Sequence, residues 1–312
     1  MIPAIVVVGS LNMDFTVSVK HLPAAGETVL GGGFQMVPGG KGANQACAAG
    51  KLAGSYALVK MIGRVGLDLF GDQLKASLSS AGVDVSFVNA SRSHPTGVAF
   101  IAVEHSGQNA IVVASGANMD LPSADVEAMR RVFRGAAIAL FQLESPLDTV
   151  AAALRIAREE GLTTILDPAP ARALENEVLV EVDILTPNES EALALLGRPA
   201  RRLAPGEAAE IAAALRERGP RTVIIKLGDQ GCFADDGAYA EHFAPFRVET
   251  KDATGAGDTF NAGLAVALTE GKTLPEAIRF ANASAAVSVT RMGAQSSVPT
   301  RGEVIEFLAQ NS

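Results

Sequence analysis

Short apolar runs alternate along the chain with longer segments in which apolar residues recur every three or four positions. The apolar runs predict buried β-strands at 5–9, 57–62, 136–141, 163–166, 183–185 and 222–226. The longer segments predict helices at 43–52, 69–81, 123–133, 149–160, 190–196 and 207–218. Continuously apolar strands separated by helices are typical of a parallel sheet that is covered on both faces. We therefore expect an α/β fold whose binding sites gather at the carboxyl ends of the strands.

Four other segments alternate apolar and polar residues, as the strands of a half-exposed antiparallel sheet do. They lie at 15–19, 27–37, 97–103 and 109–114, and the last two predict a hairpin around 104–108. If these segments meet, they form a small second sheet. Such a sheet could act as a lid that keeps water away from a phosphoryl-transfer site. An ordinary edge hairpin is the alternative interpretation.

The composition argues against several classes of function. The chain has 312 residues and a formal net charge of −8, which disfavours nucleic acids and anionic membranes as partners. No apolar run reaches the roughly 18 residues that span a bilayer. The first residues carry no signal-peptide pattern, so we expect a cytoplasmic protein. Cys47 and Cys232 suit free thiols in a reducing compartment, and the four His residues do not favour a zinc site.

The segment 252–258 carries the most specific chemical signal. It reads Asp-Ala-Thr-Gly-Ala-Gly-Asp and precedes a helical pattern at 259–268. Its glycines would let backbone N–H groups crowd together where a helix begins, and such a helix start attracts anions. Asp258 would stand beside this site as a proton acceptor, which phosphoryl transfer to a hydroxyl requires. A tight turn with a capping Asp is the structural alternative.

Two polar loops in the amino-terminal part could bind a sugar. Asn12 and Asp14 follow the first strand and share one side of an extended segment, so each could bind a hydroxyl group; a stabilised turn is the alternative. The segment 39–46 reads Gly-Gly-Lys-Gly-Ala-Asn-Gln-Ala and lacks the Walker spacing of a phosphate loop. Its glycines would allow the backbone to approach a polyol closely, with Asn44 in the first helical turn. A purely structural helix entry is the rival interpretation.

Two later segments could face a nucleotide. Asn188 and Glu191 lie three positions apart at a predicted helix start, so they share a face and could order Mg²⁺-bound waters and phosphates. Ordinary helix capping is the alternative. The segment 226–231 reads Lys-Leu-Gly-Asp-Gln-Gly and follows an apolar strand. It predicts a hairpin turn, which gains a function only if a nucleotide lies across it.

Together these segments resemble the ribokinase branch of the PfkB family of carbohydrate kinases over nearly the whole chain. The segments 39–46 and 252–260 resemble the two family signatures. The segments 9–14, 142–146, 168–172 and 290–299 resemble ribokinases in particular. The resemblance implies one kinase domain over residues 1–312. It also implies a ribokinase-like three-layer α/β/α fold with a mostly parallel sheet and a small β-sheet lid that often forms a homodimer. The implied activity is ATP-dependent phosphorylation of D-ribose at its 5-hydroxyl.

The resemblance also implies roles for individual residues. Asp258 would be the general base, and the anion hole would be formed by Gly255, Ala256 and Gly257. The implied sugar-binding positions are Asn12, Met13, Asp14, Gly40, Lys41, Gly42, Ala43, Asn44, Glu144 and Asp258. The implied nucleotide-binding positions are Asn188, Lys226, Leu227, Gly228, Asp229, Gln230, Gly231, Gly257, Asp258 and Asn282.

Two kinds of cation accompany ATP in the family that the chain resembles. Glu191 would lie on the Mg²⁺ side of the phosphates and act through water. A monovalent cation, usually K⁺, would lie near the anion hole, where it would add positive potential without touching the substrate. The positions that match its site are Asp252, Thr254, Ser288, Arg291, Gly293 and Ser297, several of them through backbone carbonyls.

Two positions depart from the family pattern. Ala253 replaces a common Thr, and Lys226 stands where many relatives carry a small polar residue, which bears on nucleotide preference. A related kinase for deoxyribose, a nucleoside or a ketose is an alternative, as is a non-catalytic sugar sensor. A dinucleotide-dependent oxidoreductase is disfavoured because no Gly-x-Gly-x-x-Gly follows the first strand.

Overall fold

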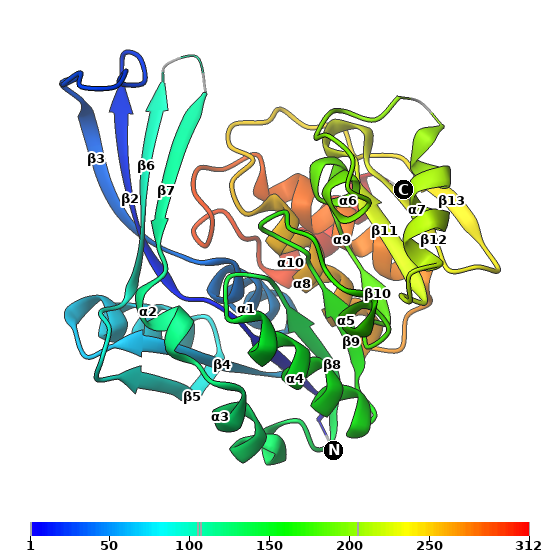
Figure 1. Ribbon diagram of the computed structural model, residues 1–312. Coiled ribbons are helices and arrows are strands. Elements are labelled where there is room, and N and C mark those ends of the chain that lie inside the picture. Colours follow the sequence, from blue (N-terminus) through cyan, green and yellow to red (C-terminus); the bar gives the residue numbers. More distant parts are fainter. Residues whose placement is uncertain (1, 105, 107, 205, 312) are drawn as a thin grey trace.

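One large sheet forms the centre of the molecule. The computed structural model describes residues 2–104, 106, 108–204 and 206–311. Within this part, nine strands form the sheet in the order β13-β12-β11-β10-β9-β8-β1-β4-β5 (Figure 1). Their bounds are β1 (Ala4–Val8), β4 (Leu58–Gly66), β5 (Val83–Ser91), β8 (Ala136–Phe141), β9 (Thr163–Leu166), β10 (Ile184–Leu185), β11 (Thr222–Lys226), β12 (Cys232–Asp235) and β13 (Ala240–Phe243).

The pairing confirms the mostly parallel sheet that the apolar runs predict. Every neighbouring pair from β5 to β11 is parallel, and within the described part of this sheet only β11–β12 and β12–β13 are antiparallel. Apolar runs do not predict β5, β12 or β13. The first of these alternates buried and exposed positions and the last is almost wholly exposed, as strands at the edges of a sheet are.

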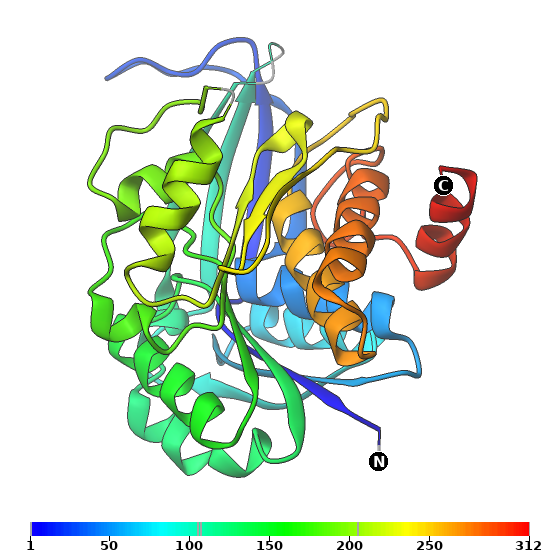
Figure 2. The same ribbon diagram turned by 90° about the vertical axis from the view of Figure 1, so that its right-hand side faces the viewer.

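Helices cover both faces of the sheet, which gives the expected three layers (Figure 2). In β1, Ile5 and Val7 enter one apolar core and Val6 and Val8 the other, because successive side chains of a strand alternate in direction. The first core is completed by α1 (Lys41–Ala53), α2 (Leu69–Ser80), α8 (Ala256–Thr269), α9 (Leu274–Ser288) and α10 (Arg301–Gln310). The second is completed by α3 (Ser123–Ala128), α4 (Leu147–Glu159), α5 (Asn176–Leu179), α6 (Glu189–Leu195) and α7 (Glu207–Arg216).

Helix lengths follow the sequence pattern with one exception. The expected helix at 123–133 is interrupted: α3 ends at Ala128, and a separate 3-10 turn covers Arg130–Val132. Among the described residues, no helix is long and apolar enough to cross a membrane.

A smaller sheet rises from one end of the large one (Figure 1). Its strands, in order, are β3 (Gly32–Gly39), β2 (Asn12–Val19), β6 (Gly97–Glu104) and β7 (Asn109–Ala114). The four alternating segments therefore do meet, although residues 27–31 precede β3. The outer pairs are antiparallel, whereas β2 and β6 pair in parallel, which the sequence pattern did not indicate. Of the expected turn at 104–108, residues 105 and 107 lie outside the described part of the chain.

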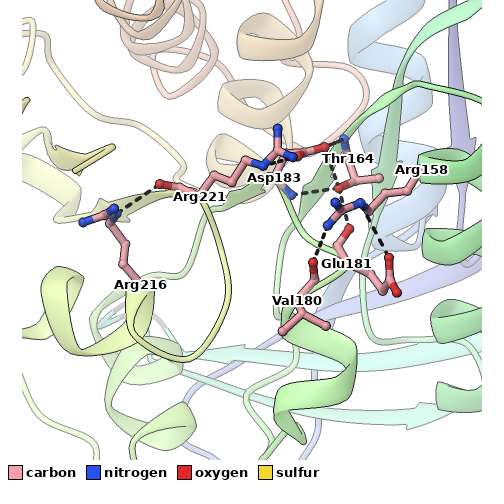
Figure 3. A network of polar contacts seen from close by, with 7 residues as sticks. All are labelled: Arg158, Thr164, Val180, Glu181, Asp183, Arg216 and Arg221. Carbon is pink, nitrogen blue, oxygen red and sulfur yellow. Dashed lines mark hydrogen bonds and ion pairs between the residues drawn. The ribbon is translucent and has the colours of Figure 1, made fainter. Parts of the chain in front are cut away.

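The two ends of the parallel strands differ in chemistry. At the amino ends, charged residues contact one another (Figure 3): Asp183 accepts a hydrogen bond from the Thr164 N–H at 2.9 Å and lies 3.4 Å from Arg221 Nε. Beside them, Arg158 Nε lies 3.6 Å from a carboxylate oxygen of Glu181. Polar residues at the carboxyl ends instead converge on the start of α8, as the binding-site rule for parallel sheets leads one to expect.

Candidate active site

The start of α8 has the features that favour the binding of an anion. Gly255, the residue before the helix, has a φ of +73°, a left-handed conformation that favours glycine. A Cβ on Gly255 would lie 3.2 Å from Ala294, so the loop also packs closely there. The N–H groups of the first helical turn have no carbonyl partner within the helix. Residues 255–257, which we call the phosphate cradle, therefore present N–H groups and the positive end of the helix dipole.

Asp258 is held beside the phosphate cradle by two side-chain amides. Its Oδ2 accepts a hydrogen bond from Asn44 Nδ2 and its Oδ1 one from Gln45 Nε2, both at 3.1 Å. The side chain is buried, and burial raises the pKa of Asp258 to about 6; the Lys41 ammonium opposes this rise and the Asp167 carboxylate adds to it. Asp258 is thus a fixed carboxylate, more basic than an exposed Asp yet ionised at neutral pH.

A second polar group forms where the chain passes from β1 of the large sheet to β2 of the small sheet. Glu144 Oε2 accepts hydrogen bonds from Ser10 Oγ at 2.6 Å and from the Lys41 N–H at 3.1 Å. Asn12 Oδ1 accepts one from Asn118 Nδ2 at 2.7 Å. Burial raises the pKa of the nearby Asp14 to about 7, with Glu144 and Asp258 adding to the rise. Two carboxyl groups and an amide are thereby gathered within electrostatic reach of Asp258, a set of polar groups that suits a hydroxyl-rich ligand.

The glycines of 39–46 are required for this gathering. A Cβ on Gly39 would lie 2.0 Å from Asp14 Oδ2, and one on Gly40 would lie 2.7 Å from the Asn12 nitrogen. A Cβ on Gly42 would meet the Ser10 nitrogen at 2.5 Å. Only glycine allows the loop to lie this close to the segment that follows β1; the close approach of the loop to a polyol stays a prediction.

Two of the sugar-binding positions implied by the family resemblance place their side chains elsewhere. Met13 is 2% exposed and Ala43 is 0% exposed, and both belong to the apolar core. Met13 points to the opposite side of β2 from Asn12 and Asp14, because strand side chains alternate, and the part that both positions play in sugar binding stays a prediction. Any contribution of Met13 or Ala43 must come from the backbone.

Lys41 lies at the centre of the carboxylates. Burial by itself would lower its pKa, but Asp258, Asp167, Glu144 and Glu191 outweigh burial and raise the pKa of Lys41 above its ordinary value. The side chain therefore supplies positive charge among Asp258, Glu144 and the other carboxylates.

Three further residues complete the site, although sequence reasoning missed them. Gln45 Nε2 bridges Asp258 and Asp167, and Gln45 Oε1 accepts a hydrogen bond from Gln142 Nε2 at 2.7 Å. Asp167 directly follows β9, and its Oδ1 accepts a hydrogen bond from Lys226 Nζ at 2.8 Å. Asp167 could have been found, since it is a carboxylate at the carboxyl end of an apolar strand. Gln45 lies within the 39–46 segment, one position beyond Asn44.

Asn188 and Glu191 cap the start of α6, as the structural interpretation of this pair expects, and they also border the site. Asn188 Oδ1 accepts from the Glu191 N–H at 2.8 Å, and Glu191 Oε2 accepts from the Asn188 N–H at 2.7 Å, a complete capping box. Among the described residues, none donates to Glu191 Oε1. Burial raises the pKa of Glu191, with Lys226 opposing and Asp167 adding. A β-bridge joins Asn188 to Lys226, which places this helix start next to the phosphate cradle.

The segment 226–231 makes the expected tight turn. A short 3-10 turn, Gly228–Gln230, connects β11 to the antiparallel β12, and the Leu227 N–H donates to the Gly231 carbonyl at 2.8 Å. Asp229 pairs with Arg202 on the surface. Nearby, Asn282 Nδ2 lies 3.7 Å from Cys232 Sγ. Asn282 also lines a cavity of about 550 Å³, together with Phe243, Pro245, Phe246, Pro275 and Arg279.

The residues matched to a monovalent-cation site occupy two joined loops, 252–254 and 288–297, which we call the cation loops. Asp252 Oδ2 accepts from the Gly293 N–H at 2.8 Å and Oδ1 from the Thr254 hydroxyl at 2.6 Å. The hydroxyls of Ser288 and Ser297 donate to local carbonyls, which leaves their oxygens available as ligands. The Arg291 guanidinium instead pairs with Glu303 at 2.5 Å, so only its backbone could face an ion.

Comparison with known proteins identifies the family. The model of the pfkB family of carbohydrate kinases matches residues 3–301. The chain is 42% identical to the ribokinase of Haemophilus influenzae, over 97% of each chain. It is 41% identical to that of Bacillus subtilis, over 98% of this chain and 99% of the relative. The structure of Arabidopsis thaliana ribokinase complexed with ribose and ATP matches with a TM-score of 0.91, at 35% identity over 99% of both chains. The chain therefore belongs to the pfkB family of carbohydrate kinases, as the sequence signatures predict.

Proposed function

We propose that this carbohydrate kinase is a ribokinase, which transfers the γ-phosphoryl group of ATP to the 5-hydroxyl of D-ribose. The observation that carries the proposal is the position of Asp258: a buried carboxylate at the start of α8, between the phosphate cradle and the sugar-side group of Asn12, Asp14 and Glu144. The full-length similarity to ribokinases supports ribose as the sugar.

We infer the following mechanism for this reaction. Asp258 accepts a hydrogen bond from the sugar hydroxyl and orients its oxygen toward the γ-phosphorus. As the new O–P bond forms, the bond to the oxygen bridging the β- and γ-phosphates breaks, the hydroxyl proton passes to Asp258, and ADP leaves. Asp258 need not ionise the alcohol beforehand, because proton transfer accompanies a loose transition state. The N–H groups of the phosphate cradle stabilise the negative charge on the transferring group.

Mg²⁺ fits the carboxylate side of the site. Oxygen ligands suit this ion, and the buried Glu191, with its Oε1 unused by the described residues, could hold one of the ion's waters. Bound there, Mg²⁺ would neutralise the nucleotide phosphates. We further propose that K⁺ binds between the cation loops. The support is the packing of Ala294 against Gly255, through which an ion in these loops could fix the phosphate cradle.

The cavity lined by Asn282 is our proposed site for the nucleotide base. It lies between the segment after β13 and one face of α9, where Arg279 stacks over the Phe246 ring at 5.2 Å. Apolar and aromatic walls with an amide at one end suit a heteroaromatic base.

We propose that residues 1–312 act as one kinase domain in which the small sheet serves as a lid and pairs with a second copy of the chain. Phe15 stacks against Phe34 and Phe100 on this sheet, and the two outer rings remain 66% and 54% exposed. Met36 and Ile111 add to the exposed apolar surface. An apolar surface of this kind favours a protein partner. The negative net charge and the buried free thiols of Cys47 and Cys232 support a cytoplasmic protein without a nucleic-acid partner.

A substrate panel tests the proposal. Purified enzyme is supplied with ATP and Mg²⁺, with and without K⁺, and with D-ribose, 2-deoxyribose, fructose or adenosine; ADP formation is measured. We expect the highest kcat/KM with ribose and an increase on adding K⁺. A higher kcat/KM with another acceptor would replace ribose as the substrate. Ribose binding without turnover would indicate a sensor.

A further inference from the structure

An ion pair joins the carboxyl ends of two strands at the phosphate cradle. Lys226 ends β11, and Asp167 directly follows β9. Lys226 Nζ donates to Asp167 Oδ1 at 2.8 Å, and the two side chains are only 15% and 4% exposed. The other oxygen of Asp167 accepts from Gln45 Nε2 at 3.1 Å, so the carboxylate is fixed from two sides. Because the Lys226 side chain is already fixed, it loses little further conformational entropy when it binds a ligand.

The ammonium faces the phosphate cradle. A Cβ built on Gly257 would lie 3.3 Å from Lys226 Nζ, so the absence of a side chain at Gly257 leaves the ammonium next to the first turn of α8. Lysine has three N–H donors. Among the described residues, Asp167 is the one hydrogen-bond partner of this ammonium, which leaves donors directed at whatever occupies the phosphate cradle.

We propose that Lys226 is a catalytic residue of the kinase reaction, whose ammonium contacts oxygens of the transferring phosphoryl group, and that Asp167 is the residue that positions it. The inference rests on the proposed function. Lys226 acts as a hydrogen-bond donor in this step. It donates hydrogen bonds to the phosphoryl oxygens while the O–P bond to the sugar forms, the bond to ADP breaks, and Asp258 takes the hydroxyl proton.

A purely structural role for Lys226 makes a different prediction. A buried carboxylate without a partner is strongly unfavourable, so Lys226 could serve only to neutralise Asp167. In that case, removing both charges together would restore activity. If Lys226 stabilises the transferring group, removing both charges leaves the reaction slow. The double variant Lys226→Gln/Asp167→Asn therefore separates the two roles.

The experiment measures kcat, both KM values and pH profiles for Lys226→Gln, the double variant, and Lys75→Gln as a control. Lys75 lies on α2 in a surface pair with Asp72 at 3.8 Å. We expect Lys226→Gln and the double variant to lose about 10²–10³ in kcat, as loss of one transition-state donor does, with the KM for ribose within threefold. Lys75→Gln should match the wild type.

The pH profile supplies the second readout. In Lys226→Gln the unpaired Asp167 carboxylate lies near Asp258, so the acid limb of the kcat profile should move to higher pH; in the double variant it should return, while kcat stays low. Recovery of kcat in the double variant, or near-normal kcat in Lys226→Gln, would overturn the role of Lys226. Wild-type turnover with ribose is measured first. Its absence would refute the proposed function, and the variants would then be compared with the acceptor that the panel identifies.

Discussion

Replacing Asp258 by Asn separates catalysis from folding at this site. The folded protein raises the pKa of this carboxyl from 3.8 to about 6, chiefly through burial. That difference corresponds to roughly 3 kcal/mol of unfavourable free energy for the ionised form at neutral pH. Asn carries no charge and removes this cost. It accepts from only one of the two amide donors, Asn44 or Gln45, and the unpaired donor costs about 1–3 kcal/mol. The two changes nearly cancel, so Asp258→Asn should fold normally.

Turnover should respond very differently. Asn can orient the hydroxyl but cannot accept its proton, and general-base catalysis is worth about 10²–10⁴ in rate. We therefore expect kcat to fall by that factor in a coupled assay of ADP release. Calorimetric titration should still detect ribose binding, since Asn12, Asp14 and Glu144 are unchanged. The exposed Asp84→Asn is the matched control. A kcat within tenfold of the wild type, in a variant that melts normally, would refute Asp258 as the base.

Three further perturbations address pH, the phosphate cradle and the lid. As the pH falls through about 6, protonation of Asp258 should lower kcat. Folding raises the pKa of Asp258 from 3.8 to about 6, so the folded state binds this proton more tightly than the unfolded chain does. The contribution of Asp258 to the free energy of unfolding should therefore decrease as the pH rises from 3.8 to about 6, which urea titrations of wild type and Asp258→Asn can compare. Gly257→Ala puts a methyl group 3.3 Å from Lys226 Nζ and should cost about 10²-fold in kcat/KM for ATP with ribose binding retained, as measured by initial rates. The proposed pairing of two copies through the small sheet predicts that Phe100→Asp sediments as a monomer and that Ile305→Asp, on α10, sediments as the wild type does.

The sequence predicts most of the large sheet because its strands are buried on both faces. Every residue of β1 is apolar and buried, so the segment is recognisable without knowing its neighbours. The edge strand β5 escapes this rule because half of its positions meet solvent. The sequence pattern also does not predict the parallel pairing of β2 with β6, because the two strands are far apart in the chain and either direction would bury the same alternating side chains. Local pattern thus indicates that a segment is a strand, but not its neighbour.

The sequence likewise predicts some residues of the candidate site and not others. Asp258 and the glycines around it are visible in the sequence because a helix start needs a particular local conformation. The family resemblance implies that positions 13 and 43 belong to the sugar site, yet the side chains of Met13 and Ala43 lie in the core. A motif identifies a segment, whereas the periodicity of the strand or helix decides which of its side chains face the ligand. Asp167 acquires its role only when β9 and β11 lie close enough for Lys226 to reach it.

The amide network around Asp258 explains why the two signatures, far apart in the chain, work together. Asn44 holds the carboxylate from a position 214 residues away, and Gln45 holds it while bridging to Asp167. Gln295, in the second cation loop, donates to Asn44 Oδ1 at 3.3 Å and is itself buried. A displacement of that loop would therefore reach the base through two hydrogen bonds, by way of Asn44. The same amide would align the sugar, so hydrogen bonds connect Gln295 of the second cation loop, Asn44 of the 39–46 segment and Asp258 to one another.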